Sequence, residues 1–561
     1  MLIRAHAAFE GSSSGSAAAV ATVVVLGLGI GLRLWRPDLA QVSFDESNVS
    51  SLVAGWKFQG AFPLAGTVSS YGFRAGPAWP WFAALGLHWS DDPYALILVG
   101  LFAGISGLLA TWWVARRWLG TWGGVAAALA HGTTFWCLLL ERGVWQPVFL
   151  QAPMALCLDS VLRLAVNRRP WALVIACGWL GVLVSVHYTA VAFVLVVLFG
   201  MWFARRELRP IHLAAAVVVG VLPLLPFLMY EVNPSVRFHD VVELVAMSSG
   251  NARLDFDTIS STIQIDSTLG AAGLGGHSAA EIAAQLGRWN NLSLLGPILA
   301  AAGLALGALS RPLRAGPPSD PLRRGALAGL RPFGVLVLPQ PTGWIMAAWT
   351  LAPIVAYLRH GAPIIFHYMF IEFVGLSVCV GMLGAWAATR AAWVRIVVFG
   401  AIGVCAVASA LSILVLLHGL DTFDLSAGYG IPVGYSRAAG AAARAVLPPG
   451  GLVLVGDDPH YGEVLRFGVG YGTASRTFED CLSVPYAQDA VYLLASEQTP
   501  GSAALEAAGA PLLTRIPRPG GDAYRVYGAL PVAPASGSLQ VPPATGNQVC
   551  DDRAVWDASQ P

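Results

Sequence analysis

Long runs of apolar residues, separated by short polar segments, fill most of the chain up to about residue 418. Each run is about 17 to 25 residues long, which is the length that a helix needs to cross a hydrocarbon layer of about 30 Å. We therefore predict an α-helical polytopic membrane protein with about eleven transmembrane helices. The predicted spans are about 17–35, 94–114, 122–140, 145–165, 171–187, 189–204, 211–230, 292–309, 342–358, 367–388 and 394–418.

Arginines gather in every second loop between these spans. Short cytoplasmic loops of membrane proteins carry an excess of lysine and arginine, so we predict that these loops, and the N-terminus with them, are cytoplasmic. The arginines are Arg4, Arg116, Arg117, Arg168, Arg169, Arg205, Arg206, Arg209, Arg311, Arg314, Arg323, Arg324, Arg390 and Arg395. The opposite side then receives the loops 36–93 and 231–291 and, because the number of spans is odd, the tail from about 419.

The tail alternates helical and strand-like segments, among them the apolar runs "GLVLVG" and "AVYLLAS". This pattern predicts a small soluble extracytoplasmic α/β domain over 419–530, about 110 residues, which is enough for a core of its own. The Pro-, Ser- and Gly-rich end, 531–561, is predicted to be disordered.

Composition supports the membrane assignment and argues against a soluble or nucleic-acid-binding protein. Of 561 residues, 56% are hydrophobic and only 12% are charged, about half the charged fraction of a soluble protein, and mean hydropathy is +0.63. The net charge of +1 gives no electrostatic basis for binding nucleic acid. No CxxC spacing suggests zinc. Cys481 and Cys550 lie in the tail, where an oxidising compartment would allow them to pair.

The first predicted external loop begins with an acidic pair, Asp45 and Glu46, in "QVSFDESNVSSLVAGW". The apolar residues that follow repeat at helical spacing, so we predict an amphipathic helix that rests in the membrane interface. They are Val49, Leu52, Val53 and Trp56. Asp45 or Ser47 could cap this helix, so the acidic pair has a purely structural interpretation beside any functional one.

The order of these features resembles the GT-C glycosyltransferases, integral membrane enzymes that use polyprenyl-phosphate-linked sugars. The closest branch contains protein O-mannosyltransferases and lipid A aminoarabinose transferases, and the resemblance covers about residues 17 to 418. The segments that carry it are "SFDES", "YGFRAGPAWPWFAALG", "ERGVWQPVFLQAPMALCL", "GVLVSVHYTAVAFVLV" and "HYMFIEF". The chain departs from the family where His367 replaces the usual arginine before Tyr368, and in the long insert at 310–341.

The resemblance implies that Asp45 is the general base, which takes the proton of a hydroxyl or amine acceptor as it attacks the sugar with inversion. Glu46 would orient Asp45 or bind the acceptor. The leaving phosphate needs positive charge to hold it. Residues predicted to bind substrate are Tyr71, Arg74, Arg142, His187, Arg359, His360, His367 and Tyr368.

Several of these residues have a second interpretation. Arg142 could simply pair with Glu141, Arg359 could mark the membrane interface, and His187 could be satisfied structurally at a helix end. We predict no defined metal site, because two adjacent carboxylates are too few ligands, although a divalent metal beside Asp45 stays open.

The predicted partners are the lipid bilayer, a polyprenyl-phosphate sugar donor and an extracytoplasmic acceptor, which would be a protein, lipid or glycan. The alternatives are a polytopic transporter or lipid flippase, and a non-catalytic envelope assembly protein. Transporters usually show paired halves with broken helices, and we see no such halves. The glycine-rich stretch in the loop 231–291 predicts a movable cover over the first loop.

Overall fold

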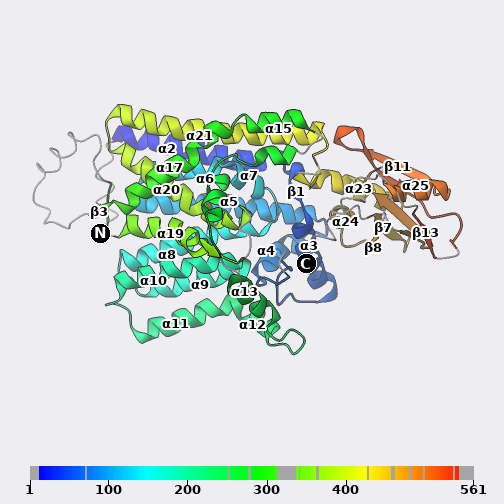
Figure 1. Cartoon of the computed structure of the whole chain (residues 1–561), viewed down its shortest axis with the longest axis horizontal. Coiled ribbons are helices and arrows are strands. Elements are labelled where there is room, and N and C mark those ends of the chain that lie inside the picture. The colour runs from blue at the N-terminus through cyan, green and yellow to red at the C-terminus, as the bar shows by residue number, and fades with distance from the viewer. Residues whose placement is uncertain are drawn as a thin grey trace, which may run out of the picture.

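The computed structural model describes residues 12–69, 72–249, 253–275, 279–312, 336–339, 341–361, 366–425, 429–456, 462–478, 483–496, 499–534 and 537–541. It consists of an elongated bundle of helices with a smaller sheet-containing part at one end (Figure 1). We call that end the sheet end of the bundle.

The bundle is built from long apolar helices. They are α2 (Ser12–Leu34), α5 (Tyr94–Leu119), α6 (Thr121–Thr133), α7 (Phe135–Leu140), α8 (Gln151–Ala165), α9 (Trp171–Val186), α10 (Val194–Ala204), α11 (Pro210–Val221), α12 (Leu225–Glu231), α17 (Leu295–Ala308), α19 (Thr342–Tyr357), α20 (Phe373–Ala388) and α21 (Ala392–Thr422). Short 3-10 segments extend some of them: η2 (Gln146–Leu150), η3 (Tyr188–Phe193), η4 (Leu222–Leu224) and η6 (Phe366–Glu372).

Small residues allow these helices to pack closely, as is usual within membranes. A Cβ added to Gly303 of α17 would lie 1.8 Å from the Cys379 carbonyl oxygen of α20, so only glycine fits at this contact. Helix α20 forms the centre of the bundle, and its residues are almost all buried.

Among the described residues, seven helical stretches are long and apolar enough to cross a membrane, and three shorter ones, Trp171–Val186, Tyr188–Ala204 and Thr342–Tyr357, are also apolar. These ten agree with ten of the predicted spans. The eleventh, 122–140, is two helices, α6 and α7, because Thr134 between them has an extended ψ of 127°. The count of eleven crossings therefore stays a prediction.

Two long connections lie outside the spans. The first contains η1 (Pro37–Leu39), β1 (Gln41–Val42), α3 (Phe44–Gln59) and α4 (Ala78–Trp89). The second contains α13 (His239–Ser249), β2 (Arg253–Leu254), α14 (Asp257–Ile265) and η5 (Ala271–Gly275). It leads into α15 (Ala280–Gly287) and α16 (Asn290–Ser293), which belong with α17 to the apolar stretch Ala280–Ala308. Helix α14 packs against η6, α19 and α7, and β2 pairs with β5 (Arg359–His360). A further parallel pair joins β3 (Arg311–Pro312) to β4 (Val337–Leu338).

The C-terminal part contains a five-stranded sheet in the order β11-β12-β10-β7-β8. Strands β7, β8 and β10 are parallel to their neighbours within that group, and β11 and β12 form an antiparallel pair at its edge. The elements are β6 (Ile431–Pro432), α23 (Val433–Ala445), β7 (Leu452–Gly456), α24 (Gly462–Val469), β8 (Ser475–Phe478), β9 (Ser483–Pro485), β10 (Ala490–Leu494), α25 (Pro500–Ala507), β11 (Leu512–Pro517), η7 (Pro519–Gly521), β12 (Ala523–Tyr527) and β13 (Ser538–Gln540).

The start of the segment predicted to be disordered is ordered. Strand β13 pairs antiparallel with β9, and Leu539 and Val541 beside it pack against a hydrophobic core of the C-terminal part. These two apolar side chains stabilise the segment, so the prediction of disorder is wrong for 538–541. Both Cys481 and Cys550 lie outside the described residues, as does most of the insert at 310–341.

The sheet-containing part is docked on the first connection. Strand β1 pairs antiparallel with β6, and the Tyr429 hydroxyl donates to the Leu39 carbonyl at 2.7 Å. Helix α24 packs against α3, where Tyr471 forms a hydrogen bond with Ser50. The first connection therefore lies between the bundle and the sheet (Figure 1).

Candidate active site at the N-terminus of α3

The N-terminus of α3 is capped by Ser43 and Glu46. The Glu46 carboxylate accepts hydrogen bonds from the Ser43 amide, at 2.9 Å, and from the Ser43 hydroxyl. This is a capping box, whose signature is serine followed three residues later by glutamate. The prediction that Asp45 or Ser47 caps this helix is wrong, because the first helical residue is Phe44 and the cap must precede it.

Asp45 makes a different contact. Its Oδ2 accepts a hydrogen bond of 2.8 Å from the indole Nε1 of Trp145, which lies between α7 and η2. The side chain of Asp45 is half-buried, whereas that of Glu46 is fully enclosed. Asp45 is thus the member of the acidic pair that is both fixed in position and partly exposed.

The two carboxyl groups differ in their electrostatics. Burial raises the pKa of Asp45, and the hydrogen bond from Trp145 opposes that rise. Burial is also the largest influence on Glu46 and raises its pKa to about 7, although the Ser43 hydrogen bonds act in the opposite direction. A carboxylate with a raised pKa is a better proton acceptor, which suits a general base.

Segment η6 contacts Trp145, the partner of Asp45, and also carries Tyr368. The ring of Phe370 lies 5.8 Å from Trp145 in an edge-to-face arrangement. In the same segment, Tyr368 lies 6.1 Å from the His187 ring and 6.4 Å from Tyr188. The separations are between ring centroids. His187 and Tyr368 are therefore neighbours, although 180 residues separate them in the sequence.

His187 ends α9 and begins η3. Its Nδ1 lies 2.7 Å from the Thr189 hydroxyl and accepts a bond of 3.3 Å from the Thr189 amide. The imidazole stacks on Tyr188 with 4.7 Å between ring centroids, and Phe73 meets Tyr188 at 5.0 Å. This cluster joins the first connection to the ends of α9 and α20.

Arg74 lies next to Phe73. Its Nη1 donates to the Gly66 carbonyl at 3.2 Å, and it also interacts with Tyr230 at the end of the α11–α12 helical stretch. Two other predicted residues cannot be placed, because Tyr71 and the side chain of His367 lie outside the described part of the chain.

Arg359 and His360 form β5 beside β2. Nε2 of His360 lies 2.8 Å from Oδ1 of Asp255, and Arg359 is exposed. Arg359 and His360 therefore lie beside the residues that lead into α14.

Arg142 is fully buried and holds the C-terminal end of α2. Its Nη1 donates to the Leu32 carbonyl at 2.9 Å and its Nη2 to the Arg36 carbonyl at 2.5 Å. Arginine commonly satisfies the free carbonyls at a helix end in this way. The geometry favours a structural role and does not support the predicted contact between Arg142 and a donor phosphate.

Glu141 does not pair with Arg142. It forms an ion pair with Arg33 of α2, with Nε of Arg33 at 2.7 Å, and lies 3.1 Å from Nε2 of His131. All three side chains are buried. This network fixes α2 against α6 and the turn that follows α7.

Two groups of described residues gather enough ligand atoms for a metal ion. In the first, His131, Cys137 and Glu141 are buried, but the guanidinium of Arg33 already supplies the positive charge there. The second comprises Asp255, Asp257 and His360. Neither group contains Asp45 or Glu46.

Sequence reasoning missed Ser43 and Trp145. The signal for Ser43 was present as Ser-x-x-Glu in "SFDE". No local pattern marks Trp145 as a partner of Asp45, because the two residues lie 100 positions apart.

No protein-family model matches this chain, and no curated protein sequence matches it. Solved structures do. ArnT from Cupriavidus metallidurans bound to undecaprenyl phosphate is 14% identical, with a TM-score of 0.55, and the match covers 90% of this chain and 97% of ArnT. The apo structure of the same protein gives 12% identity, a TM-score of 0.55 and coverage of 92% and 98%.

The oligosaccharyltransferase of Archaeoglobus fulgidus is more distant, with 11% identity, a TM-score of 0.43 and coverage of 82% of this chain and 64% of that chain. ArnT is an aminoarabinose transferase of the GT-C superfamily, and its match extends over the bundle and the sheet-containing part together. The chain is thus a multi-pass integral membrane protein with an ArnT-like fold, and the resemblance to the GT-C glycosyltransferases that its sequence predicts is confirmed at the level of fold.

Proposed function

We propose that this protein is a membrane glycosyltransferase that moves a sugar from a polyprenyl-phosphate donor to an extracytoplasmic acceptor. The observation that carries the proposal is that the Asp45 carboxylate is held in position but takes no part in the helix cap. Ser43 and Glu46 satisfy the helix cap, so Asp45 is not needed for capping, and Trp145 holds its carboxylate at 2.8 Å. The fold supports the proposal, because ArnT, whose fold is similar, has been solved with undecaprenyl phosphate bound.

In the proposed reaction, Asp45 takes the proton of the acceptor as the acceptor oxygen or nitrogen attacks the anomeric carbon. The bond from this carbon to the phosphate oxygen breaks, and the anomeric centre is inverted. The electron pair leaves with the phosphate, a weak base that needs positive charge rather than an acid. Arg74, Arg359 and His360 are our candidates for that charge, and a divalent metal would act in the same way.

His187, Tyr368 and the undescribed Tyr71 and His367 complete the proposed substrate-binding set. Glu46 is proposed to fix α3 rather than to touch substrate, because both its carboxylate contacts in the capping box go to Ser43. The proposed topology places the N-terminus in the cytoplasm, eleven spans in the membrane and the sheet-containing part outside the cytoplasm. Lys57, paired with Asp91 in the first connection, has no role in this scheme.

The test is the Asp45→Asn variant. Asparagine still accepts the hydrogen bond from Trp145 but cannot take the proton, so we expect normal expression and a loss of transfer of roughly two or more orders of magnitude. Transfer from a polyprenyl-phosphate sugar is measured in membranes. Asp91→Asn, in the same connection, is the matched control and should retain full activity, and Glu46→Gln should have less effect than Asp45→Asn.

Near-normal turnover by Asp45→Asn would overturn the assignment. The alternatives make different predictions for the same variants. A lipid flippase would move labelled polyprenyl lipid across the vesicle membrane without consuming the sugar. For a non-catalytic assembly protein, Asp45→Asn would change neither sugar transfer nor lipid movement.

A further inference from the structure

Helix α14 buries three polar side chains and exposes two large apolar ones, which is unusual for a helix on a water-soluble surface. Its buried polar residues are Thr258, Ser261 and Thr262, and its exposed large apolar residues are Ile259 and Ile263. Oγ1 of Thr258 donates to the Tyr357 carbonyl at 2.7 Å, which fixes the polar face inward. Leu254 and Phe256 before the helix are 77% and 76% exposed. A surface of this kind marks an interaction site.

Helix α13 repeats this arrangement. Asp240 is buried, whereas Phe238, Val242 and Val245 are exposed. Val242 and Val245 are three positions apart, so they share one face of the helix, and Phe238 lies just before it. Both helices therefore direct an apolar face away from the protein.

The exposed faces continue the lipid-facing surface of the bundle. The stretch Pro210–Glu231 is apolar enough to span a membrane and is only 11% buried. Its exposed apolar residues near α13 include Leu225, Leu228 and Met229, and Val232 follows them. Figure 1 shows α12 and α13 together at the rim of the bundle, beside the end of α11. Beside α14, Val355 of α19 is also exposed.

A groove runs along the exposed face of α14. It has a volume of about 540 Å³ and is lined by Phe256, Ile259, Ser260, Ile263, Gln264, Leu269 and Gly270. The lining is largely apolar and carries no charged side chain. It therefore suits a hydrocarbon chain rather than a sugar or a phosphate.

We propose that α13 and α14 are embedded in the membrane leaflet at the sheet end, with their apolar faces toward lipid, and that the groove along α14 holds an acyl chain of a phospholipid from that leaflet. The continuity of α13 with the exposed face of α11 and α12, and of α14 with the exposed Val355 of α19, selects the bilayer as the partner. The predicted external loop 231–291 would then lie partly within the membrane interface. This inference does not depend on the reaction that the protein catalyses.

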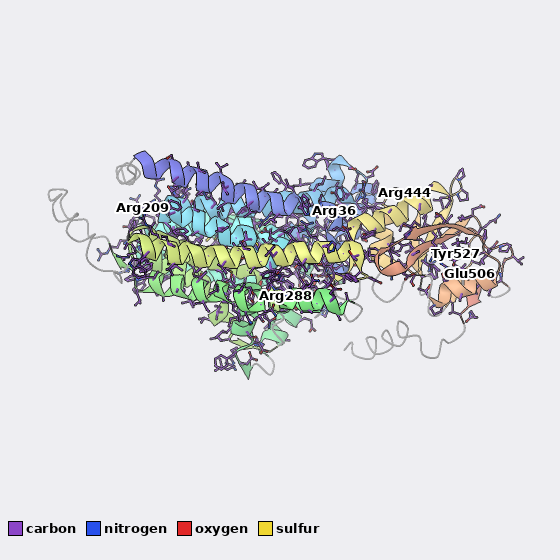
Figure 2. The ribbon with its side chains drawn as sticks, turned by 90° about the horizontal axis from the view of Figure 1, so that it is seen from above. Arg36, Arg209, Arg288, Arg444, Glu506 and Tyr527 are labelled. Atoms are coloured by element: carbon purple, nitrogen blue, oxygen red, sulfur yellow. The ribbon has the colours of Figure 1, made fainter. Side chains whose placement is uncertain are left out.

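The test measures the surroundings of single introduced cysteines. Full-length Val242→Cys and Ile263→Cys variants carry a nitroxide label and are reconstituted in phosphatidylethanolamine–phosphatidylglycerol vesicles without polyprenyl phosphate. Collisions with oxygen report lipid, and collisions with a water-soluble nickel chelate report water. Val218→Cys on α11 is the lipid reference, Glu506→Cys at the far tip of the sheet-containing part (Figure 2) is the water reference, and the labelled parent protein is the blank.

We expect both test positions to show an oxygen-to-nickel ratio several-fold above that of Glu506→Cys and close to that of Val218→Cys. A ratio like that of Glu506→Cys would overturn the proposal. A lipid-like ratio that appears only after polyprenyl phosphate is added would also overturn it, because the groove would then belong to the carrier and not to the bilayer. The oxygen-to-nickel collision ratio of the label does not depend on glycosyl transfer. Failure of the proposed function would therefore leave this result unchanged.

Discussion

At the scale of single residues, the division of labour between Asp45 and Glu46 is the central feature. Two neighbouring carboxylates on one helix end would normally compete for the same free amides. Here Glu46 satisfies the cap through Ser43, which leaves the Asp45 carboxylate to Trp145. The indole N–H can only donate a hydrogen bond, so it stabilises the ionised carboxylate of Asp45 and cannot take a proton itself.

Replacing Trp145 should therefore shift the pH dependence of transfer. The hydrogen bond lowers the pKa of Asp45, so Trp145→Phe removes a stabilising contact of the carboxylate and raises that pKa. Because only the carboxylate form accepts a proton, the acidic limb of the kcat/KM profile should move to higher pH. We expect a shift of roughly 0.5–1 pH unit, since one such bond to a partly exposed charge contributes on the order of 1 kcal/mol.

The control for this experiment is Trp81→Phe, which removes another indole donor of the first connection, bonded to the Pro63 carbonyl. Its profile should match that of the parent protein. A Trp145→Phe profile with an unmoved acidic limb would contradict the role of Asp45 as the base.

At the scale of elements, two buried arginines fix the C-terminal end of α2, from which the first connection starts. Arg142 donates to the carbonyls of Leu32 and Arg36, and Arg33 pairs with Glu141. Both contacts join α2 to the turn that also carries Trp145. The helix end and the partner of Asp45 are thus positioned by the same short turn.

The Arg142→Met variant separates this role from substrate binding. Methionine fills a similar volume but leaves buried carbonyls without donors, which costs about 1–3 kcal/mol for each unsatisfied group. We expect a clearly lower unfolding temperature in detergent and an unchanged KM for the lipid donor at permissive temperature. Arg74→Met is the matched comparison. An increased donor KM with normal stability for Arg142→Met would restore the phosphate-binding interpretation.

At the scale of the whole molecule, the sheet-containing part and α3 behave as one assembly. Besides the β1–β6 pair, Arg437 of α23 forms an ion pair with Asp92 at the end of the first connection, and α24 packs against α3. Figure 2 shows Arg36 and Arg444 near the sheet end and Arg209 at the opposite end. The side of the membrane that holds the sheet must therefore also hold Asp45.

The topology can be tested with fusions to the full chain. The proposed orientation predicts that alkaline phosphatase after Pro561 is active and that a fluorescent protein, which fails to mature outside the cytoplasm after export, is dark there. Fusions after Arg390, between α20 and α21, should give the opposite pair of results. A fluorescent fusion after Pro561 would place the sheet and Asp45 in the cytoplasm and remove the proposed site from the extracytoplasmic acceptor.

The sequence by itself determined what depends on local patterns. Apolar run length predicts the spans, because crossing a hydrocarbon layer requires a fixed number of helical residues. The stripe from Val49 to Trp56 predicts α3, and the runs around Leu452–Gly456 and Ala490–Leu494 coincide with β7 and β10. The capping box was also readable in the sequence, but it was not recognised there.

The tertiary structure decided which residues meet. The Asp45–Trp145 bond, the Arg33–Glu141 pair and the neighbourhood of His187 and Tyr368 each join residues 100 or more positions apart. Such contacts depend on how helices pack and where each helix ends, and a single sequence carries no periodic signal for them. For the same reason, the sequence left Arg142 open between substrate binding and a pair with Glu141. Only the packing of α2 against that turn assigned it to the carbonyls at a helix end.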